Sequence, residues 1–242
     1  MATGQDNDLE QIDSDEAAGR YSRRGVLGRV GLVAAGAALG GAATAVGATP
    51  AGAATSKVGD GPSGATVAEF VAHIDQNGFD FSAYGYLTRL IGVDSAALFN
   101  NPADRSEKTA LFTASASGKL VTRSSDGAVH SLDIEGEMRL FQRTTAGATY
   151  TDPASFATGT AIATYSMTLQ DVLTVIAPDT GIPTLTGDMT QLESKKLSGA
   201  PGSKAVGHKN LRLRFSATGI GTRSEATAPK ATLTVAGSFA VA

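Results

Sequence analysis

A few polar side chains occupy positions where the alternation of the surrounding sequence otherwise places apolar ones. Burying such a group costs free energy unless another group pairs with it. These side chains therefore either form a shared binding site for a small ligand at one end of a sheet, or lie solvated or hydrogen bonded at the ends of their strands. Tyr165 lies deeper, where its ring belongs to a core and its hydroxyl needs a partner. The candidate ligand-binding residues are His130, Gln142, Tyr165, Asp171 and Gln191.

Other residues that could do chemistry point instead to a solvated surface. Glu135, Glu137 and Arg139 are spaced by two, so they share one face of a strand, but it is the face opposite the apolar residues. This arrangement is typical of a charge ladder in water and not of an acid–base pair. The nucleophile motif G-x-S-x-G does not occur in the chain. The sequence therefore identifies no catalytic residue.

Composition argues against several classes of cofactor and partner. The chain has no cysteine, which excludes disulfides and thiolate metal sites. Its three histidines, His73, His130 and His208, are far apart and form neither H-x-H nor H-E-x-x-H. We therefore predict no metal and no cofactor. The formal net charge of −3 offers no electrostatic basis for binding nucleic acid.

Period-2 alternation recurs along most of the chain and predicts strands that are buried on one face. The clearest example is Ala128–Arg143, in which Leu132, Ile134 and Met138 alternate with charged and polar residues. The Asp126-Gly127 step before it is typical of a tight hairpin turn. Further strands are predicted over residues 78–91, 109–123, 160–176, 182–195, 210–223 and 231–241.

One stretch has helical spacing. Thr66 and Glu69 have the separation of a capping box, and Val67, Phe70 and Ile74 fall on one face of a helix. The pattern favours a short helix here. An edge strand is the alternative.

One-sided antiparallel strands joined in order bury their apolar face in a closed barrel or a sandwich. The strands follow one another in up-and-down order, which favours the barrel. The last strand also carries no charged residue that would protect a free sheet edge, as an open sandwich needs. We predict an all-β fold, a single antiparallel up-and-down β-barrel of about seven to eight strands with one short N-terminal helix. Small inner residues either let the strands pack closely or leave a lumen for a ligand. They are Ala110, Ala114, Ala116, Gly118, Gly136, Ala161, Ala163, Ala217, Gly219 and Gly237.

Residues 1–53 are interpreted as a polar leader and a signal peptide. Ser22 and the pair Arg23 and Arg24 precede apolar residues and resemble the twin-arginine (Tat) export motif, and a weakly apolar tract ends in an A-x-A cleavage site at Ala53. This resemblance implies transient recognition by the twin-arginine translocase and a secreted or cell-envelope protein. A retained membrane anchor is the alternative, since a tract of about 20 residues can span a bilayer. Residues 54–65 are predicted to be a flexible linker and 66–242 the barrel domain.

The aromatic strand, the sequence GVDSAALF and the successive hairpins with Ala- and Gly-rich interiors together resemble calycin-type barrels, among them the allene oxide cyclase and dirigent-like group. The resemblance covers residues 78–241 and rests on pattern, so it transfers no functional residue. It implies a barrel whose interior holds a small apolar molecule. Three functions stay open: an exported barrel that binds such a ligand or acts at the cell surface, a cofactor-independent isomerase or cyclase of the allene oxide cyclase type, and a structural or adhesion module.

Overall fold

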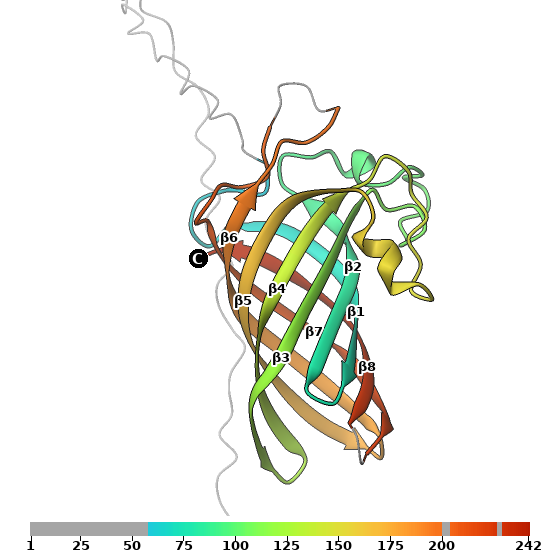
Figure 1. Cartoon of the computed structure of the whole chain (residues 1–242), viewed down its shortest axis with the longest axis vertical. Coiled ribbons are helices and arrows are strands. Elements are labelled where there is room, and N and C mark those ends of the chain that lie inside the picture. The colour runs from blue at the N-terminus through green and yellow to red at the C-terminus, as the bar shows by residue number, and fades with distance from the viewer. Residues whose placement is uncertain (1–57, 200–203, 227–228) are drawn as a thin grey trace, which may run out of the picture. The chain divides into compact units, whose positions relative to one another are not determined.

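The computed structural model describes residues 58–199, 204–226 and 229–242. Eight antiparallel strands form a closed barrel in which each strand pairs with the next and β8 pairs with β1 (Figure 1). The all-β, up-and-down barrel predicted from the alternation is therefore confirmed, with eight strands. Their bounds are β1 Thr66–Asn77, β2 Asp80–Leu90, β3 Phe112–Asp126, β4 Val129–Gln142, β5 Thr160–Ala177, β6 Thr180–Ser194, β7 Arg212–Glu225 and β8 Lys230–Val241.

Alternation and turn chemistry account for the strands locally. In β4, Leu132 and Ile134 are buried, while Asp133 and Glu135 beside them are exposed. The hairpin from β3 to β4 turns at Gly127, whose φ of 55° lies in the left-handed region that glycine adopts without steric cost. The hairpin predicted at this position is confirmed.

The predicted N-terminal helix is wrong. Its residues form β1, which pairs with β2 on one edge and with β8 on the other. The register of β1 against β8 shifts between Thr66 and Ala68, so that Val67 is an extra residue of β1, and such a bulge brings residues three apart onto the same face of a strand. Val67 and Phe70 therefore both line the interior, with a spacing that imitates a helical face. Pairing of the β1 backbone on both edges, which closes the barrel, outweighs a weak local helical preference.

The two ends of the barrel differ. The hairpins β1–β2, β3–β4, β5–β6 and β7–β8 turn at one end, and the longer connections lie at the other (Figure 1). The longer connections contain two short 3-10 helices, η1 (Ser95–Leu98) and η2 (Pro153–Ala157). Leu98 and Phe156 of these helices are fully buried, and the helices contact β2 and β3. The barrel thus carries a second apolar layer on part of its outer face.

Residues 58–65, part of the segment predicted as a linker, lie at the end with the long connections. Val58 is buried and forms a parallel bridge with Val206, and the amide of Gly59 donates to the carbonyl of Ile91 at 2.9 Å. Residues 54–57 and the predicted signal peptide lie outside the described residues. Within the described ranges, no helix is both long and apolar enough to cross a membrane.

Two facing glycines let β3 and β4 approach closely. Gly118 pairs directly with Gly136 across the two strands. A Cβ atom on Gly136 would lie 2.0 Å from the carbonyl oxygen of Ser117 and 2.7 Å from the Cα of Gly118. At this point the small inner residues serve close packing of the backbone.

Candidate functional site

The barrel encloses an apolar lumen with a volume of about 120 Å³. Four alanines, Ala72, Ala83, Ala114 and Ala116, form part of its wall. Because an alanine reaches less far inward than a leucine or phenylalanine, the side chains do not fill the interior. Small inner residues thus have two effects at different positions: Gly118 and Gly136 bring backbones together, and alanines such as Ala114 and Ala116 leave space in the interior.

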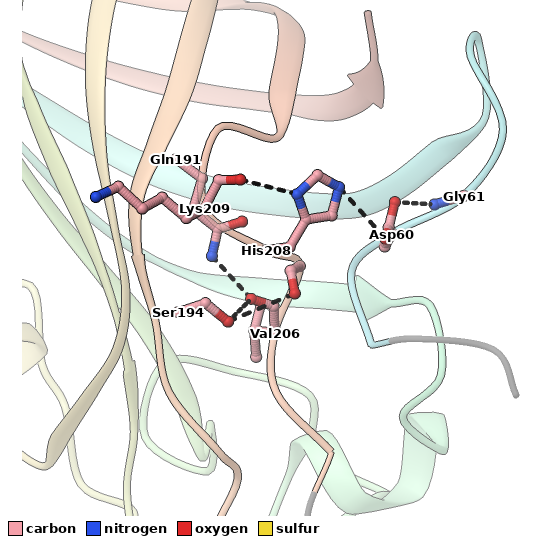
Figure 2. A network of polar contacts seen from close by, with 8 residues as sticks. Asp60, Gly61, Gln191, Ser194, Val206, His208 and Lys209 are labelled. Atoms are coloured by element: carbon pink, nitrogen blue, oxygen red, sulfur yellow. Dashed lines mark hydrogen bonds and ion pairs between the residues drawn. The ribbon is translucent and has the colours of Figure 1, made fainter.

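The lumen is closed at the end that carries the long connections. Gly59 and Val206 line it there, and the amide of Gly207 donates to the carbonyl of Val58 at 2.7 Å. Polar contacts tie the same segments together. Figure 2 shows the His208 ring, whose Nδ1 lies 2.9 Å from the Lys209 carbonyl oxygen and whose Nε2 lies 3.8 Å from a carboxylate oxygen of Asp60.

At the hairpin end, the interior widens into a mouth of about 330 Å³. A narrower space of about 40 Å³, the neck, lies between the mouth and the lumen. The neck shares Phe81, Asp171 and Leu233 with the mouth, and shares Met167 and Leu185 with the lumen. Lumen, neck and mouth thus form a column of space inside the barrel, with its apolar part innermost.

Asp171 is the buried acidic side chain of this column. It lies on the inner face of β5 and is only 5% exposed. Its Oδ1 accepts a hydrogen bond from the amide of Thr184 at 3.2 Å, and within the described residues its Oδ2 has no hydrogen-bond partner. Burial raises the pKa of Asp171 to about 6, although the bond from Thr184 opposes this rise. The neck therefore holds a carboxyl group that gains or loses its proton close to neutral pH.

Four basic side chains line the mouth, namely Arg123, His130, Arg223 and Lys230. Burial lowers the pKa of His130, and the positive charges of Arg123 and Arg223 lower it further. His130 Nδ1 lies 2.7 Å from Ser125 Oγ, and Arg223 forms an ion pair with Asp179 at 2.9 Å. Arg123 is exposed and has no ion pair within the described part of the chain.

Sequence reasoning missed both arginines, for different reasons. Arg123 reaches the inner face because the register of β3 shifts between Leu120 and Thr122. Regular alternation from Leu120 places it outside, and nothing in the sequence marks the bulge. Arg223 continues the inner alternation of β7 that includes Phe215, so the pattern alone was sufficient to locate it.

Tyr165 lies in the lumen and is 4% exposed, as predicted for its ring. The partner predicted for its hydroxyl is not found, because no group in the described ranges hydrogen bonds to it. Burial raises the pKa of Tyr165, so the hydroxyl keeps its proton and remains a donor. Tyr165 therefore places a single unpaired hydroxyl in an otherwise apolar wall.

The two glutamines predicted for the site lie at the closed end, away from the mouth. Gln191 is fully buried, and its Nε2 donates to the carbonyl of Val206 at 2.8 Å (Figure 2). Gln142 exchanges two hydrogen bonds with the backbone of Ser198, at 3.0 and 2.7 Å. Both side chains hold the connection between β6 and β7. The structure thus brings His130 and Asp171 together and separates the glutamines from them.

A second cluster that sequence reasoning missed lies on the outer face of β1 and β2. The rings of His73 and Tyr150 stack with centroids 3.7 Å apart and an interplanar angle of 11°. The Tyr84 hydroxyl donates to Asp75 Oδ2 at 2.8 Å. The sequence of residues 80–90 contains a signal for this cluster. Tyr84 and Tyr86 alternate there with Phe81 and Ala83, so both faces of the strand carry apolar or aromatic residues. Phe156 of η2 packs against both Tyr84 and Tyr150, with ring centroids 5.5 and 5.1 Å apart.

Comparisons with known proteins add no functional assignment. Within the described residues, no three histidine, aspartate or glutamate side chains come together in a way that could hold a metal ion. No family model matches the chain, and neither the curated proteins nor the solved structures that were searched contain a match. The structure shows a closed antiparallel barrel of eight strands, and no comparison connects it to a family.

Proposed function

We propose that this barrel binds one small, mainly apolar molecule in its lumen. The observation that carries the proposal is the column of space, which is apolar and closed at its inner end and reaches a polar mouth through the neck. Small-molecule sites are typically concave and apolar with a few polar groups that orient the ligand. Tyr165 and Asp171 are such groups here.

The size and chemistry of the lumen limit the ligand. Transfer of each CH2 group from water to an apolar site contributes about 0.8 kcal/mol, which the lost freedom of the ligand partly offsets. Because its volume is only about 120 Å³, the lumen fits a thin chain or a narrow ring system better than a bulky molecule. The Phe70, Phe215 and Phe239 side chains in its wall supply apolar contact area.

The test is binding of a neutral fluorescent naphthylamine, N-phenyl-1-naphthylamine, to the purified full chain. Ala116→Leu fills part of the lumen and is expected to weaken binding at least about tenfold, equivalent to about 1.4 kcal/mol. Ser82→Leu adds a leucine at an exposed position of β2 that lines neither the lumen, the neck nor the mouth, and is the matched control. An absence of binding to the unmodified chain, or equal loss in both variants, contradicts the proposal.

A cofactor-independent isomerase or cyclase is the second candidate function. Asp171 favours it, because a carboxyl group with a pKa of about 6 beside an apolar lumen is suited to proton transfer near neutral pH. The experiment is recovery of a bound unsaturated ligand after incubation with the chain, followed by NMR. A changed product that disappears with Asp171→Asn supports catalysis. An unchanged ligand leaves binding alone.

We further propose that the chain is exported through the twin-arginine route. Ser22, Arg23, Arg24 and the A-x-A site ending at Ala53 support this. The test replaces Arg23 and Arg24 together by lysine in the full chain and follows its location in a cell with that route. Export that persists in the double variant overturns the proposal.

A further inference from the structure

We propose that the neck selects a ligand whose polar end carries a hydrogen-bond donor, an alcohol or a protonated amine on an apolar body, and that the Asp171 carboxyl group binds this donor. This inference rests on the proposed function, because it names the class of molecule that the lumen takes. It assigns Asp171 a specificity role in addition to its place in the wall.

The position of Asp171 supports this role. Together with Phe81 and Leu233 it lines both the mouth and the neck, so a molecule that moves from the mouth toward the lumen passes its carboxyl group. The other two side chains at this level are apolar. Asp171 is thus the polar group nearest to the end of a ligand that rests with its apolar body inside.

The unsatisfied chemistry of Asp171 indicates what it binds. The Asp171 side chain is only 5% exposed, and the amide of Thr184 supplies one hydrogen bond to Oδ1. Within the described residues no hydrogen bond reaches Oδ2 and no basic side chain forms an ion pair with the group. A buried carboxyl group is stabilised by a donor, so a ligand hydroxyl or ammonium group supplies the contact that the protein lacks.

The basic side chains of the mouth do not need an acidic ligand in the same way, because each already has a partner or is exposed to water. Arg223 already pairs with Asp179, and His130 already contacts Ser125. Arg123 is exposed, and water therefore satisfies its charge. A carboxylate ligand that enters the neck instead faces the like charge of ionised Asp171, which disfavours it.

The separation of Tyr165 and Asp171 along β5 indicates the length of the ligand. Tyr165 lies on the same strand as Asp171, six residues nearer the closed end, which corresponds to about 20 Å at roughly 3.3 Å per residue. A ligand that spans this distance meets a carboxyl group at its outer end and a hydroxyl donor at its inner end. A second oxygen atom at the inner end of the ligand therefore finds a partner in Tyr165.

The experiment compares 1-dodecanol, dodecylamine and dodecanoic acid as competitors of N-phenyl-1-naphthylamine on the full chain at pH 7.5. We expect the alcohol and the amine to displace the dye at concentrations at least about tenfold lower than the acid, equivalent to about 1.4 kcal/mol. Asp171→Asn is expected to remove the advantage of the amine over the acid. Glu135→Gln, which neutralises an exposed acid on the outer face of β4, is the matched control and keeps it.

A pH comparison gives a second, independent measurement on the unmodified chain. Lowering the pH from 7.5 to 5 protonates Asp171, so the amine is expected to lose affinity while the alcohol keeps it. The same comparison with Asp171→Asn isolates the contribution of the other charged groups of the mouth, which are Arg123, His130, Asp179, Arg223 and Lys230.

The outcomes separate the inference from the proposed function. If the acid competes as well as the alcohol and the amine, or if the amine keeps its advantage in Asp171→Asn, the donor selectivity is overturned while binding in the lumen stands. If the dye and all three competitors fail to bind the unmodified chain, the proposed function itself is overturned. A poorly folded variant is recognised by circular dichroism, and the pH comparison then decides.

Discussion

Tyr165 and Asp171 lie on the inner face of the same strand, β5, at different depths of one apolar column. Tyr165 lies in the lumen, and Asp171 lies in the neck that leads to the mouth. The hydroxyl of Tyr165 and the Oδ2 of Asp171 both lack a hydrogen bond within the described ranges. Because both atoms belong to side chains that line the column and neither has a protein partner, the inner face of β5 offers a ligand two places for a hydrogen bond.

The first prediction concerns the effect of pH on stability through Asp171. Its pKa is raised from 3.8 to about 6 in the folded state, so folding favours the protonated form. The stability that this group contributes at low pH is lost as the pH rises from about 4 through about 6. Asp171→Asn removes this loss and is expected to be more stable than the unmodified chain at pH 7.5 by up to about 3 kcal/mol.

Urea unfolding at pH 4 and pH 7.5 measures this effect. The gain of the Asp171→Asn variant relative to the unmodified chain should be small at pH 4 and large at pH 7.5. A gain of equal size at both pH values contradicts the raised pKa.

The second prediction compares two tyrosine hydroxyl groups. Tyr165→Phe removes a hydroxyl without a partner and is expected to change the free energy of unfolding by no more than about 1 kcal/mol, in the stabilising direction. Tyr84→Phe is the matched control, because its hydroxyl donates to Asp75 at 2.8 Å. Loss of that charge-assisted bond is expected to destabilise by about 1.5–3 kcal/mol. Chemical denaturation of both variants shows whether the order is correct.

The third prediction concerns the close approach of β3 and β4. Gly136→Ala places a Cβ atom 2.0 Å from the carbonyl oxygen of Ser117, and a backbone atom cannot move aside easily. We expect a loss of at least about 2 kcal/mol in the free energy of unfolding. In Gly221→Ala the nearest atom is Cγ of Leu233 at 3.1 Å, which belongs to a side chain, so the loss should be below about 1 kcal/mol. Equal losses in thermal or urea unfolding argue against this account.

The fourth prediction uses the stacked pair on the outer face. Burial lowers the pKa of His73, although the negative charges of Asp75 and Glu107 oppose this. The folded state therefore favours the neutral ring, and the stability that this contributes above the ordinary pKa of histidine is lost as the pH falls. His73→Phe keeps an aromatic ring against Tyr150 but cannot take up a proton.

Thermal unfolding at pH 7.5 and pH 5 tests this prediction. His73→Phe should gain melting temperature relative to the unmodified chain on going from pH 7.5 to pH 5. A constant difference between the two proteins at both pH values shows that His73 does not titrate in this range.

The locations of the candidate residues show where the alternation of the sequence predicts the inner face of a strand and where it fails. His130 and Asp171 were found from the sequence because β4 and β5 keep a regular period of two around them, so each inner position follows from the last. The same rule failed for Arg123, because the bulge at Leu120 and Thr122 exchanges the two faces of β3. A single inserted residue has no signature in the sequence, since it arises from the strain of coiling a sheet into a barrel.

The amino-acid sequence was sufficient to predict seven of the eight strands, their order and the antiparallel barrel class, because alternation and turn residues act between near neighbours. That residues 66–77 form a strand and not a helix depends on the tertiary structure, since β1 gains a second partner when β8 reaches it across the closed barrel. The tertiary structure also decided that the alanines leave a lumen and that Asp171 stands in its neck. These features depend on the diameter and stagger of the closed sheet, which all eight strands set together.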